Sequence, residues 1–315
     1  MKLIVTKCKS REVYEIPVQS GISMDFNKKA CSTLKFKQSI VKTRIDIGDV
    51  VELWEGQVIL WNGIVFDVAT DFTVTAVDKL RYLKNKDVRS YKDEKVTVDT
   101  LLEDECSVLG LPYERGAVSY YMQPDVELDN SEILGTIYEM LDESLSKTGA
   151  EMILYGHKGV ITLKMQSDCT YRRQLNITKY TQKRSISDET ANHIVLYDKN
   201  KVDFVTATDY ESVRYYGVLR MIKVAGEETK EDMARWANEY LKLRNTVKIE
   251  LTVECIGGVE LLEIIQGWLI PVIIDDEENN VHINNYFIVE SASHTIIDGL
   301  VESKLRVMNY SEELV

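Results

Sequence analysis

Residues 48–78 have the sequence GDVVELWEGQVILWNGIVFDVATDFTVTAVD, and residues 267–307 have the sequence GWLIPVIIDDEENNVHINNYFIVESASHTIIDGLVESKLRV. Each stretch is typical of a strand, a turn, a long strand, a second turn and another long strand, which is the pattern of a small antiparallel barrel or sandwich. In this comparison Asn284-Asn285 stands where Asn62-Gly63 stands in the first stretch. The repeated pattern favours an internal duplication, and a chance likeness between strands is the alternative.

The residues on either side of these stretches extend each β pattern. From Leu3 to about Val77, apolar residues alternate or run over five to eight positions, so we expect one complete β domain there. A second β domain is expected from about Val247 to Val307. The fold class predicted from these patterns is mainly β with α+β inserts.

The stretch after the first β domain changes to helical spacing. Residues 96–113, VTVDTLLEDECSVLGLPY, predict a helix that stops at Gly110. Residues 131–149, SEILGTIYEMLDESLSKTG, predict a second helix that Asp129 or Asn130 caps and Gly149 closes. A hairpin is predicted at residues 151–164, EMILYGHKGVITLK. Together these elements form a small α+β insert.

The region between the insert and the second β domain is predicted to contain three strands and a long helix. Residues 191–198 and 201–209 are expected to pair, and residues 213–224, VRYYGVLRMIKV, are interpreted as a further strand. A helix is expected from about Glu227 to Leu243. Its buried face is formed by Met233, Trp236, Ala237, Tyr240 and Leu241.

Composition narrows the class of protein. A chain of 315 residues is expected to form two to four domains. Its net charge of −13 argues against wrapping nucleic acid, although passive contact with DNA in a channel stays allowed. The longest apolar stretches are too short for a membrane helix, and the N-terminus lacks a signal-peptide core, so we expect synthesis in the cytoplasm. The five cysteines are scattered, which indicates neither a disulfide framework nor a zinc site.

A search for chemistry finds no motif that a known reaction requires. The chain has four histidines; His157 is expected in a solvated turn, and His294 is expected to be half-buried and hydrogen-bonded on a strand. There is no GxSxG elbow and no phosphate-binding glycine loop. The acidic run from Asp275 to Glu278 is interpreted as a solvated hairpin tip, with a calcium loop as the weaker alternative. We therefore assign no catalytic, cofactor-binding or metal-binding residue and expect no enzyme.

Charged clusters have simple interpretations as well. The pairs Asp203 with Asp209 and Asp125 with Glu127 are interpreted as surface charges. A local basic concentration is more consistent with a docking surface for carboxylates than with nucleic acid binding, because the chain as a whole is acidic. Its members are Arg172, Arg173, Lys179, Lys183 and Arg184, with Tyr171 and Tyr180 between them.

A series of short motifs resembles one family along most of the chain. The motifs are WNGIVFDV (61–68), VTAVDKLRYLKN (74–85), MILYGHKGVITLK (152–164), TQKRSISDETANHIVLYD (181–198), ATDYESVRYYGVLR (207–220), EDMARWANEYL (231–241) and YFIVESASHTI (286–296). In this order they resemble the tail hub family of contractile phages and phage-like bacteriocins, the XkdQ-like group. The chain departs from the family pattern at Gly258-Val259, where a Gly-Asp commonly precedes a strand.

The resemblance implies an architecture similar to the hub of T-even phages and the base of VgrG spikes. Two tube-like antiparallel β-barrels are then expected at 1–80 and, with a preceding helix, at 226–315, separated by an α+β insert at 81–170 and a small β domain at 171–225. A homotrimer would form a ring of six similar barrels that joins a sixfold tail tube to a threefold spike in the baseplate of a phage or bacteriocin particle. The lumen would allow passive contact with DNA or a tape-measure protein.

Two other classes of function compete with this structural role. A tail-associated peptidoglycan hydrolase requires a carboxylate pair or a Cys/His set in a cleft, and the sequence indicates no such set. A carbohydrate-binding module requires clustered, exposed Trp and Tyr side chains. Trp54 and Trp61 lie in strand patterns and Trp236 on the buried face of a helix, which leaves Trp268 unassigned.

Overall fold

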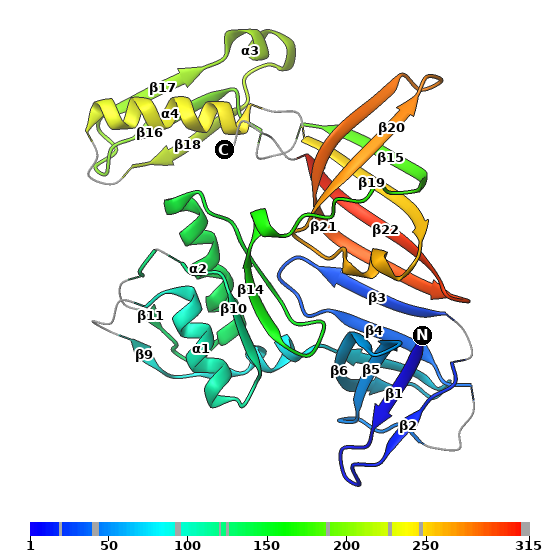
Figure 1. Cartoon of the computed structure of the whole chain (residues 1–315). Helices are drawn as coiled ribbons and strands as arrows, with labels where there is room; N and C mark the ends of the chain where they lie inside the picture. Colours follow the sequence, from blue (N-terminus) through cyan, green and yellow to red (C-terminus); the bar gives the residue numbers. More distant parts are fainter. Residues whose placement is uncertain are drawn as a thin grey trace. The chain divides into compact units, whose positions relative to one another are not determined.

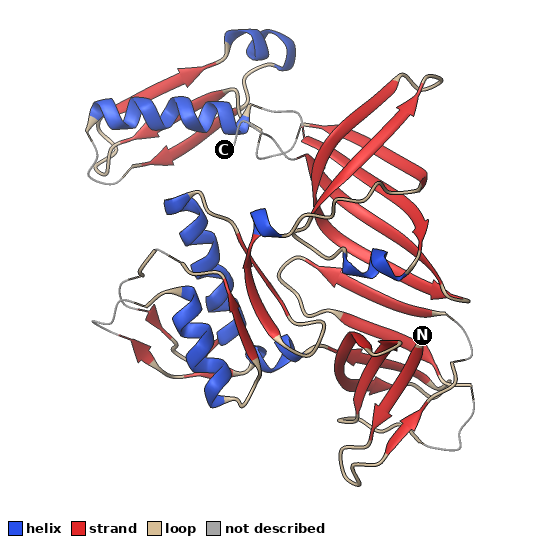
Figure 2. Ribbon diagram, viewed as in Figure 1, coloured by secondary structure: helices blue, strands red, loops and turns tan. Residues whose placement is uncertain are grey.

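The computed structural model describes residues 1–18, 21–39, 44–91, 96–119, 121–123, 126–186, 190–225, 229–245 and 248–309. These residues form two compact units, the first with residues 1–180 and 252–309 and the second with residues 181–251. The fold is mainly β with small helical inserts, as the sequence predicts (Figure 2).

The first unit begins with an antiparallel barrel in strand order β3-β4-β7-β6-β5-β1-β2 (Figure 1). Its strands are β1 (Lys2–Thr6), β2 (Val13–Glu15), β3 (Ile22–Asn27), β4 (Thr33–Lys37), β5 (Val50–Glu55), β6 (Val58–Val68) and β7 (Thr73–Val77). Alternate residues point inward, since Leu34 and Phe36 of β4 are buried between exposed or half-buried neighbours. A bridge between Val18 and Gln38 joins the chain after β2 to the chain after β4.

The second barrel has the strand order β15-β19-β22-β21, with β20 paired to β21. Its strands are β15 (Ile177–Ser185), β19 (Lys248–Gly257), β20 (Leu269–Asp276), β21 (Val281–Ile297) and β22 (Leu300–Asn309). Two contacts link its two ends, because the Tyr171 N–H donates to the Leu269 carbonyl at 2.8 Å and the Tyr180 hydroxyl donates to Asp276 at 2.6 Å. The 3-10 helix η3 (Val259–Glu263) follows Gly258, so the departure from the family pattern precedes a helical turn and not a strand.

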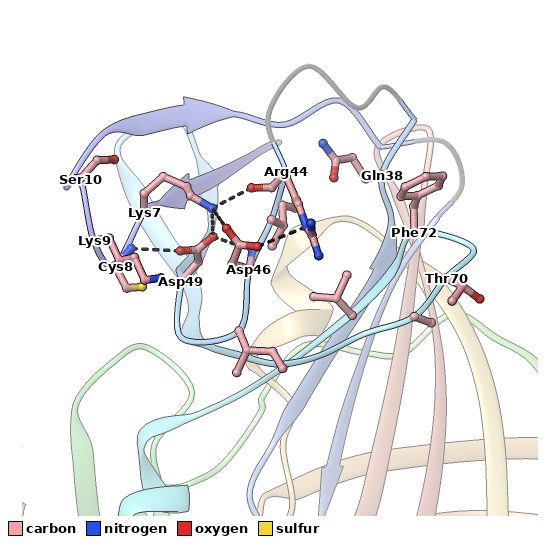
Figure 3. Close-up of a pocket in the computed structure, with 14 residues that line it drawn as sticks. Lys7, Cys8, Lys9, Ser10, Gln38, Arg44, Asp46, Asp49, Thr70 and Phe72 are labelled. Carbon is pink, nitrogen blue, oxygen red and sulfur yellow. Dashed lines mark hydrogen bonds and ion pairs between the residues drawn. The ribbon is translucent and has the colours of Figure 1, made fainter.

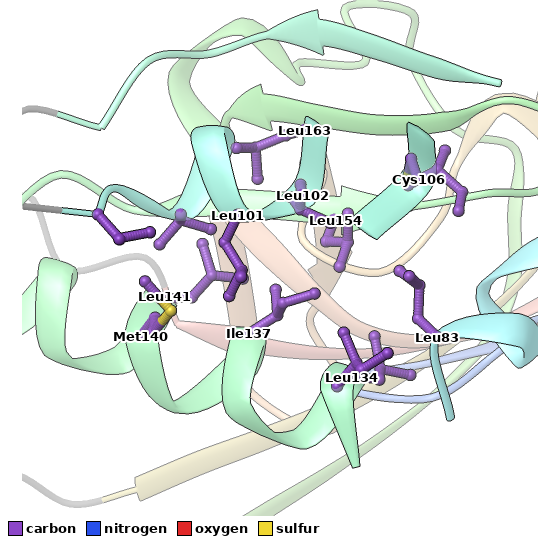
Figure 4. Close-up of a cluster of buried hydrophobic side chains, with 14 of the residues drawn as sticks. Leu83, Leu101, Leu102, Cys106, Leu134, Ile137, Met140, Leu141, Leu154 and Leu163 are labelled. Atoms are coloured by element: carbon purple, nitrogen blue, oxygen red, sulfur yellow. The ribbon is translucent and has the colours of Figure 1, made fainter. Parts of the chain in front are cut away.

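The α+β insert lies between the barrels in sequence and packs around its own apolar core (Figure 4). Its elements are η1 (Lys79–Lys84), β8 (Lys86–Asp87), β9 (Ser90–Tyr91), α1 (Val98–Val108), β10 (Tyr113–Gly116), β11 (Val126–Glu127), β12 (Ser131–Glu132), α2 (Ile133–Thr148), β13 (Met152–Tyr155), β14 (Ile161–Met165) and η2 (Gln166–Asp168). The core is formed by both helices and the predicted hairpin β13–β14, with Leu102, Ile137 and Leu163 almost fully buried.

The two predicted helices of the insert are confirmed, with one correction. A capping box between Thr97 and Thr100 starts α1, and Gly110 follows its end with a φ of 64°. Gly149 closes α2 in the left-handed conformation, as predicted. The expected cap at Asp129 or Asn130 is wrong, because residues 131–132 form β12 and pair with β8 before the helix starts.

The second unit is a three-stranded sheet covered by one helix. It contains β16 (His193–Tyr197), β17 (Phe204–Thr208), α3 (Tyr210–Tyr216), β18 (Arg220–Val224) and α4 (Lys230–Arg244). The predicted antiparallel pair is β16–β17, and α4 packs on these two strands through Met233 and Ala237. Residues 213–224 are not one strand. They contain the end of α3, a turn at Gly217, and then β18, which pairs parallel to β16.

Candidate functional site

The two barrels of the chain are joined edge to edge in one sheet. The first half of β21 pairs with β20, and its second half pairs antiparallel with β3 of the first barrel, from Ser291 with Asn27 to Ile296 with Ile22. The Ser293 hydroxyl donates to Asp25 across this joint at 2.6 Å. Strand β21 therefore offers one edge to two different barrels.

The second barrel repeats the first strand by strand. The order β15-β19-β22-β21-β20 matches the order β3-β4-β7-β6-β5. The same two hydrogen bonds also occur where each repeat starts. Gly48 donates to Val65, and Val65 donates to Asp49, at 2.9 and 2.8 Å. Their counterparts at 2.7 and 2.9 Å join Gly267 to Val289 and Val289 to Trp268.

Strand register fixes which residues correspond. A β-bulge interrupts β6 between Val65 and Asp67, and another interrupts β21 between Val289 and Ser291. Val50 pairs with Ile64 in the first barrel, just as Leu269 pairs with Ile288 in the second. By this register Tyr286-Phe287 corresponds to Asn62-Gly63, which corrects the expected match with Asn284-Asn285. The two barrels therefore share strand order, bulges and backbone hydrogen bonds, although the residues at corresponding positions differ.

A cavity of about 810 Å³ lies at the end of the first barrel (Figure 3). It is lined by the chain after β1 (residues 7–10), the loop before β5 (residues 44–47 and 49) and the end of β6 with the turn that follows it (residues 68–70 and 72), together with Gln38. Ile47 and Phe72 are 68% and 46% exposed there. The lining of the cavity therefore includes exposed apolar side chains.

Buried charge organises the loop in front of β5. The Asp49 carboxylate is fully buried and accepts hydrogen bonds from Lys7 Nζ at 2.6 Å, Cys8 N at 3.0 Å and Asp46 N at 2.9 Å. Burial works against the charged form, but these hydrogen bonds and the ammonium of Lys7 leave the pKa of Asp49 below its usual value. Because the carboxylate is bound by three donors of this chain, we interpret Asp49 as a structural residue that clamps the loop before β5 to the chain after β1.

Two buried histidines flank Phe26 of β3. His294 is fully buried on β21, with Nδ1 2.7 Å from Ser303 Oγ and Nε2 2.8 Å from the Ile264 carbonyl, so the predicted hydrogen bonds exist and its burial is deeper than expected. His157 contradicts the expected solvated turn. It is 5% exposed, packs edge-on to Phe26 and against Tyr155, and neither ring nitrogen has a hydrogen-bond partner.

The packing around His157 explains why the local sequence wrongly predicts a solvated turn. The hairpin turn that carries it lies on β6, where the Asn62 N–H donates to the His157 carbonyl at 2.6 Å. Burial lowers the pKa of His157 to about 3 and that of His294 to about 4, so both rings are neutral at pH 7. The two rings fill apolar space between β3, β21 and the insert.

Several other charged residues have structural roles. Asp209 is no simple surface charge, because it caps α3 and accepts a hydrogen bond from Asn245 at 2.6 Å. Asp125 lies outside the described residues, and Glu127 lies on β11. In the basic cluster Lys179 lies 3.9 Å from Glu254, which agrees with a surface that binds carboxylates. Residues 277–280 form the turn between β20 and β21, so Glu277 and Glu278 lie at the predicted hairpin tip, whereas Asp275 and Asp276 are the last residues of β20.

Two tryptophans of the first barrel donate hydrogen bonds to neighbouring side chains. Trp61 is fully buried and donates to Ser32 Oγ at 3.0 Å, and Trp54 donates to Glu52 at 3.0 Å. Over the described ranges, no group of three or more His, Cys, Asp or Glu side chains is placed to hold a metal ion. None of the described helices is long and apolar enough to span a membrane.

A protein-family model described as YqbQ-like matches residues 23–308, which is most of the chain. The chain belongs to the YqbQ-like family. The YqbQ protein of Bacillus subtilis is 29% identical over 228 residues, which cover 68% of this chain and 69% of that protein.

Solved structures with the same fold come from phage tails and a secretion system. The 43 kDa tail protein of prophage MuSo2 from Shewanella oneidensis is 13% identical with a TM-score of 0.65, and the match covers 98% of each chain. The prophage tail protein gp18 from Listeria monocytogenes is 14% identical with a TM-score of 0.60, over 99% of this chain and 95% of that one. The E. coli c3393 protein, a type VI secretion component, is 11% identical with a TM-score of 0.53, over 99% and 78%. The resemblance predicted from short motifs is thus confirmed at the level of fold.

Proposed function

We propose that this member of the YqbQ-like family is a structural hub of the baseplate of a phage or phage-like particle. Three chains form a ring of six similar barrels, which joins a sixfold tail tube to a threefold spike. The observation that carries the proposal is the internal repeat, because two barrels of equal strand order let a trimer present six equivalent positions. The fold shared with phage tail proteins supports the same role.

The proposed mechanism is assembly and not catalysis. Hub, tube and spike would associate through sheet edges and apolar surfaces, which require shape and not reactive groups. Three buried ionisable groups fit this role, because Asp49 holds the loop before β5 in place and His157 and His294 pack against Phe26.

Oligomeric state tests the proposal directly. Native mass spectrometry of the purified chain, with and without the tube and spike proteins of the same particle, is expected to find three copies in the assembled species. Assemblies of two, four or six copies would contradict a trimeric hub. Incubation with peptidoglycan sacculi is expected to release no fragments, and turnover that disappears on substitution of one His or Asp would contradict the non-enzymatic role.

One observation favours carbohydrate binding as a second candidate function. Tyr210, Tyr215 and Tyr216 of α3 are 80%, 77% and 49% exposed, and the rings of the last two lie 6.5 Å apart. Exposed aromatic rings are suited to stacking on sugars or to anchoring a protein partner. Binding to purified cell-wall glycan that is lost in Tyr215→Ala and retained in Tyr14→Ala, on the first barrel, would support this alternative.

A further inference from the structure

A second cavity, of about 70 Å³, lies where helix α2 of the insert meets the second barrel. Its walls come from α2, residues 151–154 at β13, the turn between β3 and β4, the turn before β20, and the strands β21 and β22. A water in the liquid occupies about 30 Å³, so the cavity has room for about two waters or for one aliphatic group of similar size. Apolar residues of the lining include Leu141, Leu145, Ile153, Ile288 and Met308.

One buried side chain of this cavity has an unpaired hydrogen-bonding atom. Gln266 lines the cavity and is 6% exposed, and its Oε1 atom is buried without a hydrogen-bond partner among the described residues. A buried acceptor without a donor is costly, and a buried water needs about two to four polar partners, which this mostly apolar lining does not offer. The cavity therefore suits a group that combines an aliphatic body with a hydrogen-bond donor, as an aliphatic amino acid in a peptide does.

A partly exposed apolar stripe leads away from this cavity on the face of β20 and β21 that is turned away from the barrel core. The stripe consists of residues that pair across the two strands, namely Leu269 with Ile288, Pro271 with Tyr286, and Ile273 with Asn284. Ile273 and Tyr286 are 47% and 43% exposed, whereas the alternate residues Ile270 and Val272 are buried. A row of exposed apolar side chains beside a cavity is typical of a surface that a partner covers.

The end of the stripe that lies away from the cavity is acidic. Asp275 pairs with His282 there, and its carboxylate lies 2.6 Å from His282 Nδ1. Exposed Glu277 and Glu278 follow in the turn. At about 3.3 Å per residue, His282 lies about 20 Å along the strand from Ile288 at the cavity. A partner with basic side chains at this distance from an aliphatic anchor is complementary to the surface, whereas a second copy of this chain carries a net charge of −13.

We propose that this surface, from the cavity at Gln266 to the acidic turn after β20, binds an extended segment of another protein. An aliphatic side chain of the size of Leu or Val enters the cavity, and the backbone N–H beside it donates to Gln266 Oε1. Lys or Arg side chains of the same segment lie against Glu277 and Glu278. The inference rests on the proposed function only for the source of the partner, which is another protein of the same particle.

Peptide binding to the isolated chain tests the chemistry of the surface. The probe is the synthetic peptide acetyl-Leu-Ser-Val-Ser-Val-Ser-Lys-amide, and binding is followed by NMR of the Ile methyl groups. Saturable shifts are expected at Ile153, Ile288 and Ile273. A peptide with Gly in place of Leu is expected to bind about tenfold more weakly, and one with Glu in place of Lys about threefold more weakly at low salt. Equal binding of the Leu and Gly peptides, or no saturable shift at the cavity, would overturn the proposal.

A substitution at Gln266 separates binding from a purely structural role. Gln266→Met keeps the length of the side chain and removes the unpaired acceptor, so the variant is expected to keep at least the wild-type melting temperature and to bind the Leu peptide about fivefold more weakly. Gln166→Met is the control, because Gln166 Nε2 already donates to the Gly267 carbonyl at 3.3 Å, and it is expected to lower the melting temperature. A lower melting temperature with unchanged peptide binding in Gln266→Met would overturn the role of Gln266.

Photo-cross-linking in the assembled particle identifies the partner. Benzoylphenylalanine in place of Tyr286 is expected to link to a segment of another protein that carries an aliphatic residue and, about six positions away, Lys or Arg. Benzoylphenylalanine in place of Lys304, which is 65% exposed on β22, is the control and is expected not to link to that segment. No link from Tyr286 in a complete particle, a link only to a second copy of this chain, or a link to a segment without basic residues would overturn the docking and leave the hub standing. A chain that enters no particle would overturn the proposed function, and the peptide titration would still decide the surface.

Discussion

Two glycines show how single residues preserve the repeat. Gly48 and Gly267 hold φ angles of 90° and 83° at corresponding positions. A Cβ on Gly48 would lie no closer than 3.7 Å to Cys8 Sγ, whereas a Cβ on Gly267 would lie 2.5 Å from Ile153 Cδ1. Both positions therefore require a residue that accepts a positive φ, but only Gly267 is closely packed against a neighbouring side chain.

Alanine substitutions at these glycines are expected to differ. Gly48→Ala is expected to lower the free energy of unfolding by about 1–2 kcal/mol, which is the cost of a left-handed backbone for a residue with Cβ. Gly267→Ala is expected to cost about 1–3 kcal/mol more because it also overpacks the core. Urea denaturation measures both. Ile153→Val is expected to recover part of the loss only in Gly267→Ala, and equal losses in the two variants would contradict this account.

His157 makes the stability of the chain depend on pH. Its pKa is about 3 when folded and near 6.5 when unfolded, so the unfolded chain binds the proton more strongly between these values. The stabilisation by neutral His157 is complete above pH 6.5 and is lost as pH falls, by up to about 2 kcal/mol at pH 5.

His157→Leu is expected to lose less stability between pH 7 and pH 5 than the wild type, as measured by urea midpoints at each pH. An unchanged pH dependence in His157→Leu would show that protonation of His157 does not oppose folding.

Residue-level prediction from sequence succeeded where the cause is local. Gly110 and Gly149 end helices because their backbone must turn left-handed, and the sequence shows this directly. His157 was misplaced because its burial comes from Phe26, which is far away in sequence. The clamp of Asp49 with Lys7 was also missed, since a residue spacing of 42 leaves no periodic signal.

The prediction of helices and strands also succeeded where the cause is local and failed where it is distant. The strands, α1, α2 and α4 follow from periodicity. Helix α3 was missed because none of its described residues is buried, so its apolar and aromatic residues show no helical stripe. The register of the two repeats was also hidden, because a bulge and unequal turns shift β21 against β6. The boundaries between the four expected domains stay a prediction.

The hydrogen bond between Tyr180 of β15 and Asp276 of β20 joins the two end strands of the second barrel. This bond is the largest of several hydrogen-bond contributions that together lower the pKa of Asp276 to about 2. In Tyr180→Phe the carboxyl pKa is expected to rise toward its usual value, as measured by NMR of selectively labelled Asp. Tyr286→Phe, also a surface tyrosine, is the control and is expected to leave the value unchanged. An unchanged pKa in Tyr180→Phe would mean that the hydrogen bond does not form in solution.

At the scale of the whole molecule, the sequence predicted the fold class and the duplication, while the strand that joins the barrels emerged only from the structure. The pairing of β3 with β21 connects residues about 270 positions apart, and open strand edges look alike in sequence. The proposal of a trimeric ring came from the resemblance to tail proteins, because the structure of a single chain does not show an oligomer.

The lumen of the proposed ring has an expected charge. A basic wall would bind phosphates and hold DNA where sliding is needed, so part of the net charge of −13 is expected on the inner face. Mapping the electrostatic potential on an assembled ring measures this. A neutral or basic inner wall, with Asp and Glu confined to the outside, would contradict the channel argument without affecting the trimer.

The most direct test of the central claim is a reconstruction of the assembled particle at a resolution that separates strands. The account predicts three copies of the chain in one ring, with six barrels at equivalent positions around a common axis. A ring of two, four or six copies, or a trimer whose barrels do not alternate around a common axis, would contradict it.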